Sequence, residues 1–491
     1  MKANRKSVLS LLVALALGAA GLAASVGLSA HPAAAAPIPA PRLPERVEPI
    51  TLPPVTMGFL ANGLQVVVVE RPQRPLAQVL LTIPGGHVHD PPQRPGLAGF
   101  VADMLRQGTR TKSARDIDSL IDSVGGSLSA SAGVEATTIT VRVLARDLER
   151  AVELAADVAI NPTFPAGEIE IQRPQWLAEV RSQFDDPGTL ARLHADTWLY
   201  GPSHPLGLFP SEQAVRAVTR EDLVAFHQQR YTPQGALLLV VGDVQPEEVM
   251  ELARRHLGTW QARSPARQPV PRAELAASRV RFVEWPGQTQ LRIELRQPGP
   301  AATVEDWLAV QLFNYVLGGG AFASRLMDVV RVRLGQTYDV RTSYAGYRFP
   351  SHFGLSTFTR NDLAWETLRV LESELERFVR EGVTEQEVQD AKGFLIFGYP
   401  MRLETLGGMA SSIFQALWLG RGLAWVSDYP VLVNRLSVPE INAAIRRHLD
   451  PNRFAVTLLG DPSVLERAPD TIWGVPKERI ERIGRTHVPA S

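Results

Sequence analysis

The chain contains an internal repeat, and this repeat limits its possible folds more than any other feature. The segment RYTPQGALLLVVGDV, which ends at Val244, matches HLDPNRFAVTLLGDP, which ends at Pro462. Other segments match at similar offsets of roughly 215 to 219 residues. The matching pairs are Gly242-Asp243 with Gly460-Asp461, VLLTIPGG with RIELRQPG, and Asp147-Leu148 with Asp362-Leu363. Two copies of one α/β module are therefore expected to fill the chain.

The apolar periodicity within each copy predicts an α+β fold. β-branched strands are expected at 63–70 and 77–84, and two alternating strands at 127–132 and 137–144. Helical patterns follow, and a buried strand closes the first copy; their ranges are 148–160, 166–184, 189–199 and 220–229 for helices and 236–241 for the strand. Each module is predicted to be an antiparallel sheet with helices packed on one face. We place the modules at residues 55–261 and 278–491, joined by a linker at 262–277 that is rich in Pro and Arg.

The N-terminus has the pattern of an export signal. Lys2, Arg5 and Lys6 precede an apolar stretch from Val8 to Ala23, and a run of small residues ends at Ala36. We predict a signal peptide at 1–36, a Pro-rich leader at 37–54 and a periplasmic location in a bacterium. The alternative is an uncleaved membrane anchor, because the apolar stretch is long enough to span a bilayer. The sequence contains no Cys, which excludes disulfides and a thiol nucleophile.

Composition restricts the possible partners. The chain has 491 residues, with 51 Lys and Arg and 51 Asp and Glu, so its formal net charge is zero. No long basic run is present, and nucleic acid and anionic membranes are therefore not expected as partners.

One apolar helix has the frame of a metal site without the ligands. The stretch PGLAGFVADMLRQGT, residues 95–109, carries apolar residues at helical spacing. On this helix Gly99 and Asp103 lie one turn apart on one face, and Ala102 flanks them. A catalytic zinc needs three protein ligands and an open position for a water molecule. Gly99 has no side chain and Ala102 no proton acceptor.

This segment resembles the pitrilysin/insulinase peptidases, or inverzincins, which carry H-x-x-E-H at the positions of residues 99–103. The resemblance covers nearly all of the chain after the leader and implies the fold described above. It implies that Glu179, in the helix EIEIQRPQWLAEV, stands where the family has its third zinc ligand. Gln172 replaces a second carboxylate that is usual there. We therefore expect this chain to bind no metal and to be inactive alone.

A second motif resembles the C-terminal signature of the same family. In NYVLGGGAFASRLMDVVRVRLGQTYDVRTSY, residues 314–344, Arg331 and Tyr338 stand seven residues apart. In the family this pair faces the zinc across the cavity. A guanidinium and a phenol can donate hydrogen bonds to a scissile carbonyl and to the oxyanion that forms from it.

Together the two motifs imply a division of labour. Some family members are heterodimers in which one subunit keeps the zinc motif and the other keeps the Arg-Tyr pair. The resemblance implies that this chain is the non-zinc subunit of a periplasmic peptidase that hydrolyses oligopeptides. The partner would hold the zinc. The strand after Ser127 is similar to the family's substrate-binding edge, to which a peptide adds as an extra strand.

Three alternatives stay open. The chain could be a scaffold subunit without a catalytic contribution, or a peptide-binding protein that acts alone. It could also be a metallopeptidase with a displaced site made of Asp103, Glu179 and a histidine from the H-x-H pair, His87 or His89.

Overall fold

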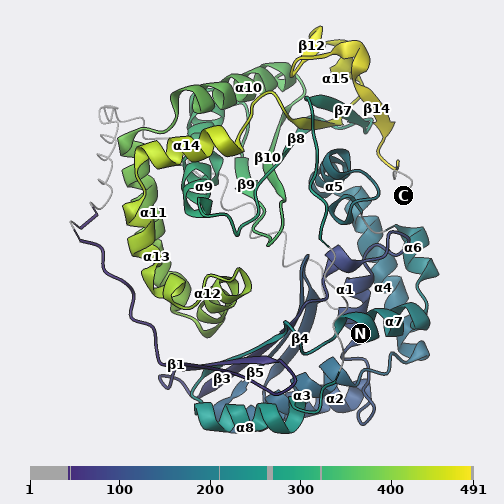
Figure 1. Ribbon diagram of the computed structural model, residues 1–491. Coiled ribbons are helices and arrows are strands. Elements are labelled where there is room, and N and C mark those ends of the chain that lie inside the picture. Colours follow the sequence, from purple (N-terminus) through teal and green to yellow (C-terminus); the bar gives the residue numbers. More distant parts are fainter. Residues whose placement is uncertain (1–42, 45, 209–210, 262–268, 321–322, 488–491) are drawn as a thin grey trace, which may run out of the picture. The chain divides into compact units, whose positions relative to one another are not determined.

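The structure is a computed structural model that describes residues 43–44, 46–208, 211–261, 269–320 and 323–487 (Figure 1). These residues belong to one compact unit. The predicted signal peptide lies outside the described residues, as do parts of the predicted leader and linker. Within the described ranges no helix is both long enough and apolar enough to cross a lipid bilayer.

The first half of the chain forms a six-stranded sheet in the order β1-β2-β6-β3-β5-β4. Its strands are β1 (Val55–Phe59), β2 (Gln65–Glu70), β3 (Leu76–Ile83), β4 (Ser127–Ala132), β5 (Thr137–Leu144) and β6 (Leu237–Gly242). The sheet is mixed, because β2 and β6 run parallel while the other neighbours are antiparallel. Strand β6 is buried along its whole length, which explains its uninterrupted apolar sequence.

The second half forms a sheet in the order β14-β7-β11-β8-β10-β9 and repeats the order and directions of five strands of the first sheet. Its strands are β7 (Arg279–Glu284), β8 (Gln290–Pro298), β9 (Val340–Tyr344), β10 (His352–Arg360), β11 (Ala455–Gly460) and β14 (Glu481–Gly484). The sixth strand differs, because β14 runs parallel to β7 whereas β1 runs antiparallel to β2. Gly242 ends β6 and Gly460 ends β11, so the aligned Gly-Asp pairs occupy equivalent places in the two sheets. The predicted repeat of one α+β module is thereby confirmed. A small hairpin, β12 (Thr471–Ile472) with β13 (Val475–Pro476), follows β11.

The helices also correspond between the halves. In the first half they are α1 (Leu97–Met104), α2 (Ala114–Ser123), α3 (Leu148–Ile160), α4 (Ala166–Asp185), α5 (Pro187–Tyr200), α6 (Glu212–Ala217), α7 (Arg220–Arg230) and α8 (Pro246–Leu257). In the second half they are α9 (Trp307–Asn314), α10 (Ala364–Glu381), α11 (Glu385–Leu403), α12 (Leu406–Trp418), α13 (Ala424–Arg435), α14 (Val438–His448) and α15 (Ser463–Glu466). Two π-helical segments, Tyr315–Gly319 and Met327–Arg333, follow α9.

Each sheet is covered on one face by helices of its own half and on the other by one helix of the other half. In β2, Val66 and Val68 face the core beneath α3 and α8, whereas Val67 and Val69 face the core that contains Ile413 of α12. Figure 1 shows α12 on the opposite side of the first sheet from α3 and α8. The alternation of side chains along a strand explains how one run of valines serves two cores.

The second sheet receives α5 in the same way. Leu190 and Ala191 of α5 pack with Val283 of β7 and Leu459 of β11 in one buried cluster. Helix α5 of the first half thus packs on the second sheet, and α12 of the second half packs on the first sheet. This exchange of helices joins the two halves by apolar packing. The sequence predicted helices on one face of each sheet, and these are the helices of the same half. It did not predict the helix from the other half that covers the second face.

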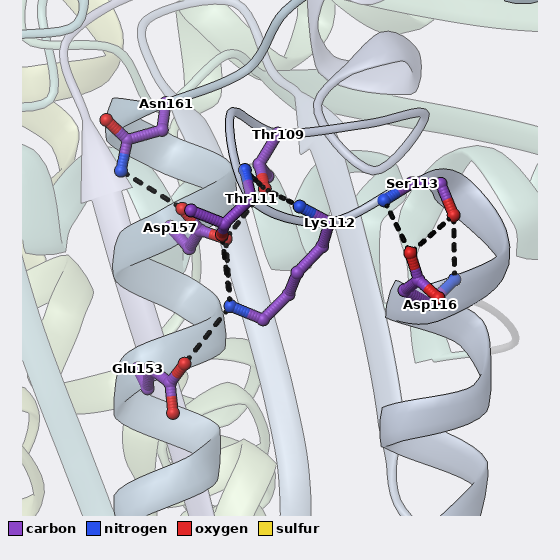
Figure 2. Close-up of polar contacts among 8 residues, drawn as sticks. All are labelled: Thr109, Thr111, Lys112, Ser113, Asp116, Glu153, Asp157 and Asn161. Carbon is purple, nitrogen blue, oxygen red and sulfur yellow. Dashed lines mark hydrogen bonds and ion pairs between the residues drawn. The ribbon is translucent and has the colours of Figure 1, made fainter.

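The turn after α1 is held onto α3 by buried polar contacts (Figure 2). The Thr109 hydroxyl donates to the Asp157 carboxylate over 2.8 Å, and the Asn161 amide donates to it over 3.0 Å. The Lys112 ammonium lies 3.2 Å from Asp157 and 3.1 Å from Glu153. A buried carboxylate with several donors fixes this turn, and with it the C-terminal end of α1.

Helix α2 begins at a capping box, which Figure 2 also shows. The Ser113 hydroxyl accepts a hydrogen bond from the Asp116 backbone N–H, and the Asp116 carboxylate accepts one from the Ser113 N–H.

Candidate functional site

Helix α1 carries the motif positions and begins where Asp90 caps it. The Asp90 carboxylate accepts hydrogen bonds from the backbone N–H groups of Gly96 (2.8 Å) and Ala98 (2.7 Å). Gly96 has φ 89°, a left-handed conformation that suits glycine at this tight entry. The helix then buries one face in the first core.

The motif positions of α1 point in two directions. Gly99 and Asp103 line a cavity of about 510 Å³. Ala102 is 1% exposed and is not among the residues that line this cavity. The family resemblance implies a general base at residue 102. In this chain that residue carries only the buried methyl group of Ala102.

Glu179 of α4 lines the same cavity, so the structure brings it together with Gly99 and Asp103. Trp176, one turn earlier in α4, donates from its indole Nε1 to the Asp103 carboxylate over 2.8 Å. Its ring also lies 4.5 Å from that of Phe100, centroid to centroid. Burial raises the pKa of Asp103, and the negative charge of Glu179 adds to this rise, whereas the hydrogen bond from Trp176 opposes it.

His87 fills the space beside Gly99. A Cβ atom at residue 99 would lie 3.3 Å from the Cε1 atom of His87, so a larger side chain there would have to displace the imidazole. His87 Nδ1 lies 3.1 Å from the Asp90 carboxylate. Burial lowers the pKa of His87, whereas the hydrogen bond to Asp90 and the negative charge of Asp90 raise it. The raising effects are larger, so the pKa lies above its ordinary value.

The H-x-H pair forms a short 3-10 turn, His87–His89. His87 lines the cavity and His89 does not. Within the part of the chain that the structure describes, no group of three or more His, Asp and Glu side chains is placed to hold a metal ion. The described residues therefore do not assemble the ligand set that the displaced-site alternative requires.

The cavity is bordered by an edge strand and by the second half of the chain. Strand β4 lies at the edge of the first sheet and contributes Ala130, Ser131 and Ala132 to the cavity wall. Tyr347 and His352 line it from the second half. An edge strand has unpaired backbone groups along one side, so a peptide in this cavity could extend the sheet.

Polar contacts between the halves surround this end of the cavity. The Tyr200 hydroxyl lies 2.9 Å from His352 Nδ1, and Asp196 forms an ion pair of 2.8 Å with Arg296. Burial lowers the pKa of His352 to about 4, so its imidazole is neutral at pH 7. Burial raises the pKa of Tyr200, which keeps its hydroxyl protonated.

Arg331 and Tyr338 lie together but outside this cavity. The Arg331 guanidinium carbon is 4.3 Å from the centroid of the Tyr338 ring, a cation–π contact. Tyr338 is 70% exposed, and Val332 and Leu334 beside it are exposed as well. Neither Arg331 nor Tyr338 lines the cavity at Gly99 and Asp103.

Sequence reasoning missed Trp176, Asp90 and the place of His87. Trp176 lies three residues before Glu179 on the same helix, and this spacing could have indicated a side chain on the cavity face. No sequence pattern indicated that His87 would lie against Gly99, because that contact depends on how the turn after β3 packs on α1.

The cavity has no base at residue 102, where the side chain is the buried methyl group of Ala102. The cavity combines an edge strand, two carboxylates at Asp103 and Glu179, and the His87 imidazole. The half-buried Arg331 and the exposed Tyr338 lie together at a separate place, outside this cavity.

Comparison with known proteins places both halves in one family. Residues 65–204 match the family model described as Insulinase (Peptidase family M16), and residues 217–395 match the model described as Peptidase M16 inactive domain. A protein of Mycobacterium tuberculosis named uncharacterized zinc protease is 31% identical over 411 residues, which are 82% of this chain and 92% of that protein.

Two further proteins are similar along most of the chain. A Helicobacter pylori protein named non-peptidase homolog is 23% identical over 422 residues, which cover 83% of this chain and 96% of that protein. A crystal structure of a peptidase M16 inactive domain from Pseudomonas fluorescens superposes with a TM-score of 0.77 at 25% identity, covering 83% of this chain and 98% of that one. The identity to the mycobacterial protein, the two family matches and the shared fold show that this chain belongs to the insulinase family, peptidase family M16.

Proposed function

We propose that the chain is the non-zinc subunit of an exported, two-subunit metallopeptidase that hydrolyses oligopeptides. In this proposal a second member of the same family holds the zinc, its water and the general base. This chain supplies Arg331 and Tyr338, which donate hydrogen bonds to the substrate carbonyl and to the oxyanion. The observation that carries the proposal is the contact of the half-buried Arg331 with the exposed Tyr338, in a chain whose base position is the buried Ala102.

The surroundings of the pair support a role at a contact with another molecule. Arg331 lies over the ring of Tyr338, so the two side chains orient each other. Val332, Leu334 and Tyr338 are exposed large apolar side chains on one short stretch. Several exposed apolar side chains on one stretch are typical of a surface that a partner covers.

The first cavity supports a role in holding peptide. Gly99 leaves room that His87 occupies, and β4 offers an open sheet edge along the same cavity. The name of the Helicobacter pylori relative, non-peptidase homolog, agrees with a member that does not act alone. The periplasmic location rests on the signal pattern of residues 1–36.

The test is peptidase activity on a quenched fluorogenic oligopeptide. It uses this chain alone, a family member with an intact H-x-x-E-H alone, and the two mixed. Activity is expected only in the mixture. Arg331→Ala and Tyr338→Phe are each expected to lower kcat/KM of the mixture by roughly tenfold or more, because each removes a donor to the transition state.

Arg360→Ala is the control, because Arg360 is also an exposed arginine of the second half, pairs with Asp362 and lies outside the stretch 331–338. It is expected to leave the activity of the mixture unchanged. Full activity in the Arg331 and Tyr338 variants would indicate a scaffold subunit instead. Peptide binding without hydrolysis in every mixture would indicate a binding protein. Activity of this chain alone that a chelator abolishes would contradict the proposal.

A further inference from the structure

A second cavity, of about 590 Å³, lies within the second half of the chain. It forms where the end of β8, the residue Pro350 before β10 and the C-terminal end of α14 meet. No residue that lines it also lines the first cavity. Its volume lies in the range of small-molecule sites, which is roughly 300 to 1,000 Å³.

The charged side chains that line this cavity are almost all basic. They come from three separated parts of the chain: Arg272, the end of α14 with Arg446, Arg447 and His448, and the following loop with Arg453. Asp450 is the one carboxylate among the lining residues. Its Oδ1 atom accepts a hydrogen bond from the Asn452 backbone N–H over 3.0 Å.

Two of the basic groups share one acidic partner, Asp306. Arg447 Nη1 lies 2.7 Å and His448 Nε2 2.9 Å from the same oxygen of Asp306. Arg453 donates from Nε to the carbonyl oxygen of Leu275 over 2.7 Å, which orients its guanidinium without cancelling its charge.

The other arginines carry uncompensated charge. Within the described ranges, no ion pair joins Arg272, Arg446 or Arg453 to a carboxylate. Three guanidinium groups therefore face a cavity with one carboxylate, and that carboxylate is engaged by its own loop.

The helix dipole accounts for only part of this cluster. Basic residues in the last turn of α14 interact favourably with the partial negative charge at the helix end. Arg272 and Arg453 lie outside that helix but line the same cavity. The helix dipole does not explain why these two arginines lie there. An anion that binds in the cavity would explain their placement.

We infer that this cavity binds a small organic anion that carries several oxyanion charges, as a phosphate ester or a polycarboxylate does. Guanidinium groups bind phosphate and carboxylate oxygens with paired, charge-assisted hydrogen bonds. Pro298, Pro300, Pro350, Leu449 and Pro451 provide apolar walls against which the carbon body of such a ligand can pack. The inference does not depend on Arg331, Tyr338 or a zinc-bearing partner.

The test is isothermal titration of the full chain with two probes, pyrophosphate and citrate, at constant ionic strength set with KCl. At least one probe is expected to bind with Kd below about 1 mM. The double variant Arg272→Gln with Arg446→Gln is expected to weaken that binding by tenfold or more. Both side chains are exposed, so the urea midpoint of unfolding is expected to fall only slightly, by the loss of the interaction of Arg446 with the end of α14.

Arg435→Gln is the matched control, because Arg435 is also an exposed arginine in the last turn of a helix but does not line the cavity. It is expected to bind the probes as the unmodified chain does. Preference for pyrophosphate would assign the site to phosphate compounds, and preference for citrate to polycarboxylates. No binding of either probe, or equal binding by the double variant and the unmodified chain, would overturn the inference.

Discussion

Trp176 illustrates how single side chains decide the character of the first cavity. In α1 the family's second ligand position is Asp103, and its carboxylate accepts a hydrogen bond from the indole of Trp176. Gly99 leaves space that His87 occupies. The sequence identified Gly99, Ala102, Asp103 and Glu179 by their place in a motif, but it could not indicate these neighbours.

At the residue scale we predict a pH dependence of stability that comes from His227. Its Nε2 atom lies 2.8 Å from the Ala159 carbonyl oxygen, and burial lowers its pKa from 6.5 to about 4. Between these pH values unfolded His227 binds a proton and folded His227 does not. The unfolded state therefore gains stability as pH falls, by up to about 3 kcal/mol for this one group.

The measurement is urea unfolding of the unmodified chain and of His227→Gln at several pH values from 7.5 to 4.5. At pH 7.5 the difference in unfolding free energy reports the lost packing of the imidazole. That difference is expected to shrink as the pH falls, because glutamine takes up no proton. A difference that stays constant over the whole range would contradict the prediction.

At the scale of single elements, local signals in the sequence predicted the helices well. Ser113 and Asp116 form a capping box at the start of α2, and the apolar stripe of α1 faces the core. The turn between α1 and α2 depends instead on Asp157, which comes from a helix more than forty residues later. Its acceptor role is not visible in the sequence.

We predict that Asp157→Ala lowers the free energy of unfolding by about 2 to 4 kcal/mol. Asp157 is 8% exposed, and it is the acceptor that the Lys112 ammonium and the Thr109 hydroxyl share. The substitution leaves both donors without this acceptor. Asp122→Ala, at an exposed position of α2, is the control and is expected to change stability by less than about 0.5 kcal/mol. Urea unfolding measures both; equal effects would show that the contacts in Figure 2 add no net stability.

At the scale of the molecule, the exchange of α5 and α12 joins the two halves. One buried cluster contains Val67 and Leu239 of the first sheet together with Ile413 of α12 and core residues of the second sheet. A cluster shared in this way couples the unfolding of one half to that of the other.

We therefore predict that residues of both halves unfold in one cooperative transition. Ile413→Ala, at a position with 0% exposure, is expected to lower the free energy of unfolding by about 2 to 5 kcal/mol and to leave a single transition. Ile171→Ala, at a helical position that is 61% exposed, is the control and should have little effect. Differential scanning calorimetry measures both, and two separate transitions, of which Ile413→Ala shifts one, would contradict the coupling.

The sequence by itself determined the repeated module, the strands and helices, and the loss of the zinc motif. These features depend on local periodicity, caps and residue identity, which act over a few neighbouring positions. Only the tertiary structure decided that His87 lies against Gly99 and that Trp176 donates to Asp103. It also decided that α5 and α12 each cover the sheet of the other half, and that separate arginines meet around one cavity. Such contacts join residues far apart in the chain, and their partners are selected by packing and charge once the sheets have formed.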